Sequence, residues 1–368
     1  MSGKMLLHLL LILSVSLSQS CTASPPLERI RLPPGFVIDV FAGHVPNARV
    51  MVRGDRGTIF ASTRSAGSIY ALRDADGDGR AEKRWTIARN LDMPNGIAFR
   101  DGALYVAAVD RIWRYDDIEN RLDDPPKPVL ITGALPKDSA HGWRYIAFGP
   151  DGKLYVAVGA PCNICDRPGY AELRRLNPDG SGMETFAQGI RNTVGFAWNP
   201  ADRTLWFTEN GRDWLGDELP PDELDHAPRA GLHFGYPYCH AGDLPDPEFG
   251  KGKHCADYAP PAQKLGPHVA PLGLAFYAGT QFPERYRGQI FIAEHGSWNR
   301  SQKIGYRVTL VTLRDGRAVG YEPFAEGWLH DEQTWGRPAY LLVMPDGSLL
   351  VSDDYAGAIY RIRYDSKT

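Results

Sequence analysis

The sequence predicts an all-β protein with the architecture of a six-bladed β-propeller. A strand-like hexapeptide recurs six times, turn-forming residues precede most of the copies, and glycine and proline contribute 39 and 29 of the 368 residues. This content of turn formers favours many short strands over long helices. The six copies of the hexapeptide occupy residues 57–62, 102–107, 152–157, 203–208, 288–293 and 347–352.

The residues around each copy indicate that the repeat is a propeller blade. Most copies follow an apolar strand and a turn, as in the Asp-Gly hairpin signal within 145–152. Several copies lead into a third strand that alternates in and out, as at 358–364. Equivalent residues of successive copies are 45, 50, 51, 85 and 59 positions apart, and strand–hairpin–strand units at such a period are typical of propellers.

Two segments depart from the regular repeat. Residues 36–41 form a strand-like stretch before the first copy, and we expect them to supply the outer strand of the last blade and close the ring. The 85-residue spacing predicts a long loop insertion at about 211–265, after the second strand of the fourth blade. Cys239 and Cys255 fall inside this insertion, where a disulfide would stiffen it.

The N-terminal segment predicts export. An apolar run over 5–17 follows Lys4, which is typical of a signal peptide, here 1–21, and is too short for a permanent membrane helix. Small residues leading into Cys21 resemble a bacterial lipobox, so a lipid anchor through Cys21 and ordinary cleavage near Ala23 are both open. A linker over 22–35 would then precede a propeller over 36–368. We expect a periplasmic protein or a membrane-anchored lipoprotein.

The other four cysteines fit an oxidising compartment. We expect disulfides between Cys162 and Cys165 and between Cys239 and Cys255. Asp166 stands where a covalently attached haem would need His, and no second Cys-x-x-Cys completes a zinc site.

The charge balance argues against a nucleic-acid partner. Lys plus Arg is 41 and Asp plus Glu is 44, a formal net charge of −3. No run of five or more like charges could form the basic stripe that nucleic acids require.

Position within the repeat singles out a set of polar residues. Loops between propeller strands converge at one mouth of the central channel, so residues just before the first strands of different blades should meet there. His141 in this position could be a general base, although a packed surface histidine is the competing interpretation. Arginines would make the mouth cationic, and exposed ion pairs are the alternative for two of them. The candidates besides His141 are Asn95, Arg191, Asn192, Arg337, and in the fifth blade Arg300 or Lys303.

Two acidic stretches are candidate cation sites. Residues 74–82 begin like a calcium loop, but Trp85 stands where an EF-hand needs a bidentate Glu, so we expect a blade turn that binds calcium weakly. The stretch 213–225, with Asp213, Asp217 and Asp222 among its acids, is the better place for a hard cation, and a solvated loop is the alternative.

Several motifs taken in order resemble the pyrroloquinoline quinone (PQQ) dependent sugar dehydrogenases, over almost the whole mature chain. The segments 210–224 and 161–165 look closest to the sorbosone and pyranose dehydrogenase branch. The matching motifs are His-Gly at 141–142, Gly-Ile-Arg-Asn at 189–192, Glu-Asn-Gly-Arg-Asp at 209–213, Gly-Asp-Glu-Leu at 216–219, Phe-Gly-Tyr-Pro at 234–237 and Ala-Pro-Leu-Gly-Leu at 270–274.

The resemblance implies a catalytic machinery. His141 would deprotonate the C1 hydroxyl of a sugar while hydride passes to the quinone, and Arg191 would stabilise the developing oxyanion. Calcium would act as a Lewis acid on the cofactor. Ala140 stands where glucose-oxidising members carry Asp, which argues against glucose as the substrate. The implied cofactor-binding residues are Asn192 and Arg337, with Arg300 or Lys303, and the implied calcium-binding residues are Gly211 and Arg212. Asn95, by its position in the repeat, is a further cofactor candidate, and Asp217, in the acidic stretch, is a further calcium candidate.

The sequence therefore predicts an exported oxidoreductase that oxidises an aldose or related sugar with PQQ and calcium. Its electrons would pass to an external acceptor, a cytochrome or a quinone. Two other functions compete, because propellers host many activities. One is a metal-dependent lactone hydrolase of the gluconolactonase type, which 93–96 resembles. The other is a non-catalytic propeller that binds a ligand.

Overall fold

A computed structural model describes residues 25–367 of the protein. The predicted signal peptide and Cys21 lie outside these residues. Between residues 25 and 367 there is no helix of sufficient length and hydropathy to cross a membrane. Short 3₁₀ turns, such as η1 (Leu27–Arg29), are the helical elements of this part of the chain.

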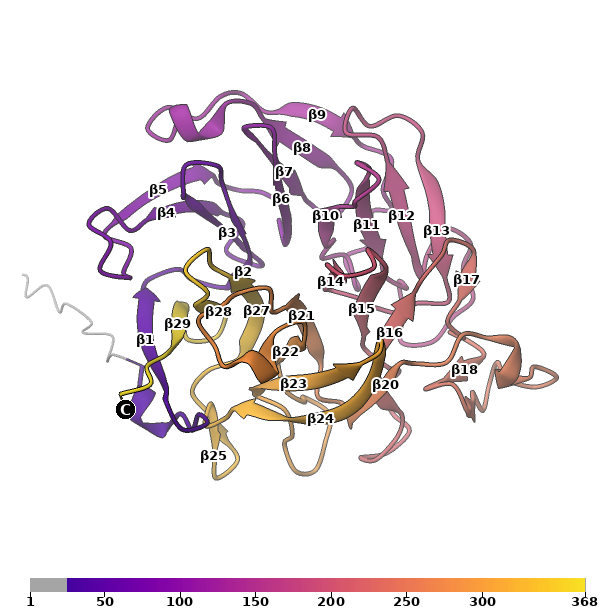
Figure 1. The fold of residues 1–368 in the computed structure, drawn as a ribbon. Helices are drawn as coiled ribbons and strands as arrows, with labels where there is room; N and C mark the ends of the chain where they lie inside the picture. The colour runs from indigo at the N-terminus through magenta and orange to yellow at the C-terminus, as the bar shows by residue number, and fades with distance from the viewer. Residues whose placement is uncertain (1–24, 368) are drawn as a thin grey trace, which may run out of the picture.

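Six sheets stand around a central axis, which confirms the predicted six-bladed propeller (Figure 1). The first strand of each blade lies nearest the axis. The first blade consists of β2 (Ala48–Arg53), β3 (Ile59–Thr63), β4 (Ile69–Arg73) and β5 (Lys83–Ala88). The second consists of β6 (Gly96–Arg100), β7 (Ala103–Ala107), β8 (Ile112–Tyr115) and β9 (Val129–Thr132). The third consists of β10 (Ile146–Phe148), β11 (Leu154–Val158), β12 (Glu172–Leu176) and β13 (Glu184–Gln188).

The other three blades complete the ring. The fourth blade consists of β14 (Phe196–Trp198), β15 (Leu205–Glu209), β16 (Pro221–Ala227) and β20 (Gln263–Pro267). The fifth consists of β21 (Pro271–Phe276), β22 (Ile290–Glu294), β23 (Arg307–Arg314) and β24 (Arg317–Ala325). The sixth consists of β27 (Pro338–Val343), β28 (Leu349–Asp353), β29 (Ala358–Tyr364) and β1 (Phe36–Ala42).

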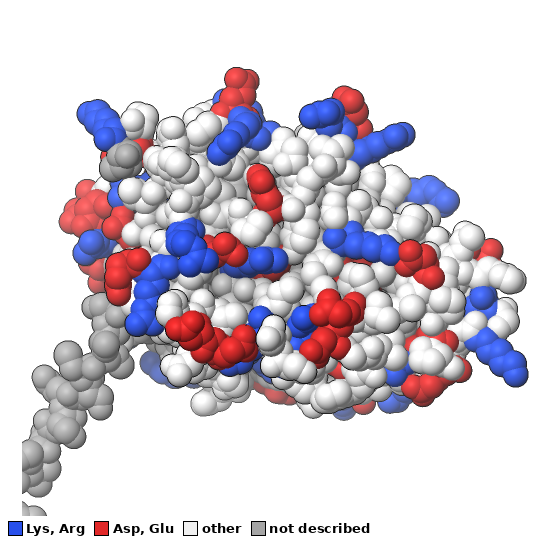
Figure 2. All heavy atoms as spheres, turned by 90° about the horizontal axis from the view of Figure 1, so that it is seen from below, with Lys and Arg blue, Asp and Glu red and all other residues white. Residues whose placement is uncertain are grey.

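The six repeated hexapeptides provide the second strand of each blade. Every residue of β3, β7, β11, β15, β22 and β28 is buried. Neighbouring blades cover both faces of these strands, which is why they are apolar almost throughout rather than alternating. Charged side chains lie on the outside, where Figure 2 shows both signs interspersed over one face.

The ring closes as predicted, through pairing of β1 with the last strand of the chain. Strand β1 pairs antiparallel with β29, Phe36 opposite Tyr364, and the two lie side by side in Figure 1. The Phe36 ring is 8% exposed and meets the rings of Phe282 at 4.7 Å and Phe324 at 5.0 Å between centroids. The closing strand is therefore fixed by its aromatic contacts as well as by its hydrogen bonds.

The predicted position of the insertion is wrong. A third strand, β16, lies inside the expected loop, and the long excursion spans residues 228–262, between the third and fourth strands of the blade. The error has a physical cause, because β16 is built from acidic residues. Asp222, Glu223 and Asp225 are at most 5% exposed, whereas a sequence pattern of this kind is typical of a solvated loop.

The excursion leaves its own blade and returns. Its strand β17 (Leu232–His233) pairs parallel with β13 of the third blade, and a hairpin of β18 (Cys239–His240) and β19 (Leu244–Pro245) follows and projects beyond the ring in Figure 1. The expected disulfides both form, between Cys162 and Cys165 and between Cys239 and Cys255.

We predict that Phe36→Ala lowers the free energy of unfolding by about 3–5 kcal/mol, the usual cost of truncating a buried phenylalanine. Chemical denaturation followed by tryptophan fluorescence measures the change. Tyr355→Ala is the control, because this aromatic ring is 62% exposed and should change stability by less than about 0.5 kcal/mol. A Phe36→Ala protein as stable as the wild type would show that β1 does not secure the ring.

Candidate functional site

A cavity of about 410 Å³ opens where the loops of five blades converge. The first blade contributes Arg49 and Arg64, the third His141 and Trp143, and the sixth Arg337; the fourth and fifth blades provide the remaining walls. This is the size range of small-molecule sites. The cavity therefore lies at the mouth of the propeller that the repeat register predicted.

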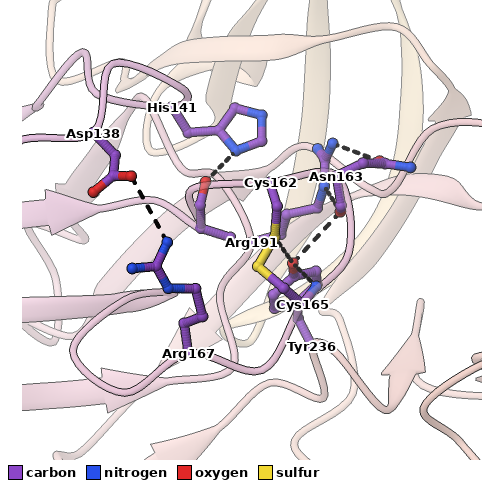
Figure 3. Close-up of a disulfide and its surroundings, with 9 residues drawn as sticks. Asp138, His141, Cys162, Asn163, Cys165, Arg167, Arg191 and Tyr236 are labelled. Atoms are coloured by element: carbon purple, nitrogen blue, oxygen red, sulfur yellow. Dashed lines mark hydrogen bonds and ion pairs between the residues drawn. A yellow bond between two sulfur atoms is a disulfide. The ribbon is translucent and has the colours of Figure 1, made fainter.

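His141 is held as a neutral base. Its backbone lies in the left-handed region, with φ at 47°, and its Nδ1 donates to the carbonyl of Ala160 at 2.7 Å (Figure 3). This bond places the proton on Nδ1 and leaves Nε2 as the acceptor. Burial, and after it the positive charge of Arg191, lowers the pKa of His141 to about 3. The imidazole is therefore neutral at physiological pH.

Arg191 uses every N–H of its guanidinium. It is 3% exposed; Nε donates to the Asn163 carbonyl at 2.8 Å, and Nη1 donates to the carbonyls of Asn210 at 3.1 Å and Gly211 at 2.7 Å. Nη2 donates to Asn163 Oδ1 and to Asp213 Oδ2, both at 2.9 Å. The ion pair with Asp213 neutralises the buried charge.

One short loop, residues 160–165, positions both His141 and Arg191. The Ala160 carbonyl accepts from His141, and the Ala160 N–H donates to the Arg191 carbonyl at 2.7 Å. Asn163 accepts from Arg191 through its backbone and its side chain, and its Oδ1 also accepts from the Asp213 N–H at 2.7 Å. The disulfide between Cys162 and Cys165 encloses Asn163 (Figure 3). Sequence reasoning did not identify Asn163.

The opposite wall is strongly cationic. Arg49 pairs with Asp354 at 2.8 Å, whereas Arg64 and Arg337 have no carboxylate within ion-pairing distance among residues 25–367. Arg64 lies over the ring of Trp143 at 4.4 Å, and Arg337 donates to the carbonyls of His295 at 2.9 Å and Gly296 at 2.6 Å. Burial, and then the charge of Arg49, lowers the pKa of Arg64. Two guanidinium groups thus face the cavity without an ion pair of their own, and the nearby Asp354 carboxylate is paired with Arg49.

Two carboxylates from the acidic stretch line the cavity. Asp213 pairs with Arg191, and Asp222 accepts the N–H groups of Gly211 and Ala270, each at 2.8 Å. Burial raises the pKa of Asp222 to about 7. Of the stretch predicted as a cation site, Asp213 and Asp222 thus line the cavity and Asp217 does not.

Five of the predicted site residues line the cavity together: His141, Arg191, Asn192, Gly211 and Arg337. Asn95 lies behind the wall, fully buried, where its Oδ1 accepts from Arg49 Nε at 3.1 Å and its Nδ2 donates to the Arg144 carbonyl at 3.3 Å. Asn95 therefore positions Arg49 by a hydrogen bond and does not itself line the cavity.

The other predicted residues lie outside the cavity. Arg300 pairs with Glu218 at 2.8 Å, and the Lys303 N–H donates to Glu332 at 2.9 Å. The Arg212 side chain is directed into the insertion, where it pairs with Asp246 at 2.5 Å.

Asp217 accepts from the Ser301 N–H at 3.1 Å, and this hydrogen bond lowers the pKa of Asp217.

The calcium-like loop lies apart from all of these residues, between β4 and β5. There Asp74, Asp76, Asp78 and Glu82 bring ligand oxygens within 4.8 Å of one another.

A family profile described as TrAA12-like matches residues 30–365. The chain belongs to this family. The match confirms the family resemblance predicted from the motifs.

Similar proteins match the whole chain or part of it. An uncharacterized protein of Borreliella burgdorferi is 32% identical, over 96% of this chain and 97% of its own. The pyrroloquinoline quinone-dependent pyranose dehydrogenase of Coprinopsis cinerea is 23% identical over 94% of this chain, which corresponds to 56% of that longer protein. An aldose sugar dehydrogenase of Escherichia coli is 31% identical over 45% of this chain and 46% of its own.

Solved structures share the fold. A calcium structure of a family AA12 enzyme from Trichoderma reesei has a TM-score of 0.83 at 18% identity, covering 94% of this chain and all of that one. The holo form of the pyranose dehydrogenase PQQ domain from Coprinopsis cinerea has a TM-score of 0.78 at 19% identity, covering 91% of this chain and 97% of that one.

We predict that Asn163→Ala lowers the free energy of unfolding by about 1–3 kcal/mol, because it removes hydrogen bonds to a buried charged group. Denaturant titration measures the loss. Asn177→Ala is a matched control, since the Asn177 side chain bonds to Ser181 at 2.9 Å on an exposed turn. Equal stability of the two variants would contradict the role given to Asn163.

Proposed function

We propose that this protein is a PQQ-dependent dehydrogenase that oxidises the C1 hydroxyl, or the hydrated aldehyde, of an aldose or related sugar. One observation carries the proposal. A neutral histidine and a buried arginine share a cavity whose opposite wall holds two arginines without carboxylate partners. General base, oxyanion stabiliser and anion-binding wall are the parts that this reaction needs.

The residues of the cavity fit PQQ, a planar tricarboxylate. Arg64 and Arg337 would bind carboxylates, because neither forms an ion pair with another described residue, and the amide of Asn192 offers a further polar contact. When bound, PQQ supplies the acceptor for the hydride that leaves the sugar. Calcium would be held by oxygen ligands at Gly211 and by the carbonyl of Arg212, with the Asp213 and Asp222 carboxylates nearby.

His141 performs the proton transfer in the proposed mechanism. Its Nε2 accepts the proton of the C1 hydroxyl, while the Nδ1–H to Ala160 bond keeps the ring in the required tautomer. The low pKa keeps the base form populated across neutral pH. The two electrons of the C1–H bond leave as hydride, and the former hydroxyl oxygen becomes the carbonyl oxygen of the product.

Arg191 stabilises the oxyanion in the proposed mechanism. All of its N–H groups are already bonded to protein acceptors, so a direct hydrogen bond to the sugar would require one of them to exchange. Because the Asp213 carboxylate balances the charge of Arg191 in the resting cavity, stabilisation of the oxyanion would depend on this exchange.

Export rests on the N-terminal sequence, with a lipid anchor at Cys21 and ordinary cleavage near Ala23 as alternatives. An external cytochrome or quinone as electron acceptor rests on the proposed dehydrogenase activity. The sorbosone-like specificity and the exclusion of glucose rest on the motifs and on Ala140. Of the competing functions, a hydrolytic metal centre fits the arginine-rich wall less well than an anionic redox cofactor does.

We predict that the purified protein reduces a dye in the presence of aldoses only when both PQQ and Ca²⁺ have been added. Absorbance of the dye follows turnover, and a chelator-treated sample without PQQ is the control. Activity that survives exhaustive chelation and cofactor removal would contradict the proposal, and so would inactivity of the loaded protein toward all aldoses and sorbosone.

We predict that His141→Ala lowers kcat by about 10² or more, because a positioned general base typically contributes 10²–10⁴. PQQ affinity, measured by fluorescence titration, should change little. In the wild type, the low pKa of His141 should place the acid limb of the kcat/KM profile below pH 5, since protonation of the base becomes significant only there. Near wild-type turnover of His141→Ala would place the base elsewhere.

We predict that Arg337→Ala weakens PQQ binding by at least tenfold while kcat at saturating PQQ falls less. Arg300→Ala should leave the PQQ dissociation constant within twofold, because Arg300 pairs with Glu218 outside the cavity. Titration of both variants with PQQ decides the point. Equal losses in the two would show that both arginines contact the cofactor.

A further inference from the structure

Two exposed tryptophans meet at the rim of the cavity. Trp214 and Trp298 are 66% and 65% exposed, and their ring centroids are 5.3 Å apart at an interplanar angle of 89°. Trp298 also lines the cavity. The other seven tryptophans of the chain are buried or half-buried. Large aromatic rings left open to water beside a cavity indicate a binding surface.

The pair is anchored to the catalytic wall. Asp213 and Asn299, the neighbours of the two tryptophans in sequence, are joined by a 2.8 Å hydrogen bond from Asn299 Nδ2 to Asp213 Oδ1. The other carboxylate oxygen of Asp213 pairs with Arg191. The Trp214 backbone has φ at 71°, a conformation that costs a bulky residue energy and persists where the surroundings impose it. The hydrogen bond between Asn299 and Asp213 thus ties together the two segments that carry the rings.

We propose that Trp214 and Trp298 form a carbohydrate subsite outside the cavity, so that the substrate is a di- or oligosaccharide whose reducing end enters the cavity. This inference rests on the proposed function. In an edge-to-face pair, the faces of the two rings point in two different directions. The C–H face of a pyranose is apolar and can stack on such a ring face, while the sugar hydroxyls point outward to water. Two indole faces next to the cavity match the next sugar rings of a chain.

The size of the patch favours a sugar over a protein. Among the other exposed large apolar residues, Leu219 lies on the same loop as Trp214, between β15 and β16, and adds a single aliphatic side chain. The others are Val129 and Leu130 on β9, Val319 on β24 and Tyr355 after β28. Two indoles cover far less than the roughly 800 Å² that each partner contributes to a stable protein interface. They are sufficient for the stacking of one or two pyranose rings.

The first test is kinetic and uses sugars of increasing length. The PQQ- and Ca²⁺-loaded enzyme is assayed with xylose, xylobiose and xylotriose, and in parallel with glucose, cellobiose and cellotriose. For the series that is oxidised, Trp214→Ala should lower the ratio of kcat/KM for the trisaccharide to that for the monosaccharide at least tenfold, through KM. Tyr355→Ala, an exposed aromatic ring far along the chain, should leave this ratio unchanged.

The second test does not depend on activity. Binding of xylotriose and cellotriose to the PQQ-free protein is measured by calorimetry, for the wild type and for Trp214→Ala with Trp298→Ala. Loss of binding in the double variant supports the subsite even if the loaded protein oxidises no sugar, which would refute the proposed function alone.

Three results would overturn the subsite. They are equal losses for mono- and trisaccharide, a weakened PQQ affinity in Trp214→Ala, which would make the pair a cover for the cofactor, and trisaccharide binding that is absent or independent of both tryptophans.

Discussion

The buried ion pair of Arg191 with Asp213 organises the cavity wall. A guanidinium that is 3% exposed must be neutralised and must have all its N–H groups bonded. Here the acceptors come from the 160–165 loop and from residues 210–213. Removal of any one acceptor leaves a charged donor unsatisfied, so these loops hold one another in place. The same 160–165 loop then sets the tautomer of His141.

The acids of β16 show a second consequence of burial. Glu209 faces Glu223 across the strand pair, and both Asp225 oxygens are buried without a partner in the described structure. Burial raises the pKa of Glu223 to about 7 and that of Asp225 well above its ordinary value. Because these folded pKa values exceed the unfolded ones, their contribution to stability is greatest in acid and declines as the pH rises toward neutrality.

The cavity separates two kinds of charge. The wall with Arg191 and Asp213 is internally neutral, whereas Arg64 and Arg337 on the other side lack carboxylate partners. An anionic cofactor would restore the balance on the cationic side and leave His141 neutral between the walls. The exposed tryptophans stand beside Asp213, so the rim that would receive a sugar is fastened to the wall that would oxidise it.

Several of these features could be predicted from the sequence. The repeat determined the six blades, the closing strand and the mouth at which His141, Arg191, Asn192 and Arg337 meet, because strands of equal register place their preceding loops at the same end of the ring. An even number of cysteines in a chain predicted to be exported similarly predicted both disulfides.

Tertiary structure alone decided the rest. The repeat register selects a loop but not the direction of a side chain, so Arg300, Lys303 and Asp217 were placed at the mouth although each pairs outside it. Asn163 and Arg49 carry no local signal, since their roles depend on partners far along the chain. Strand β16 looked like a solvated loop because local composition does not reveal that neighbouring blades bury its carboxylates.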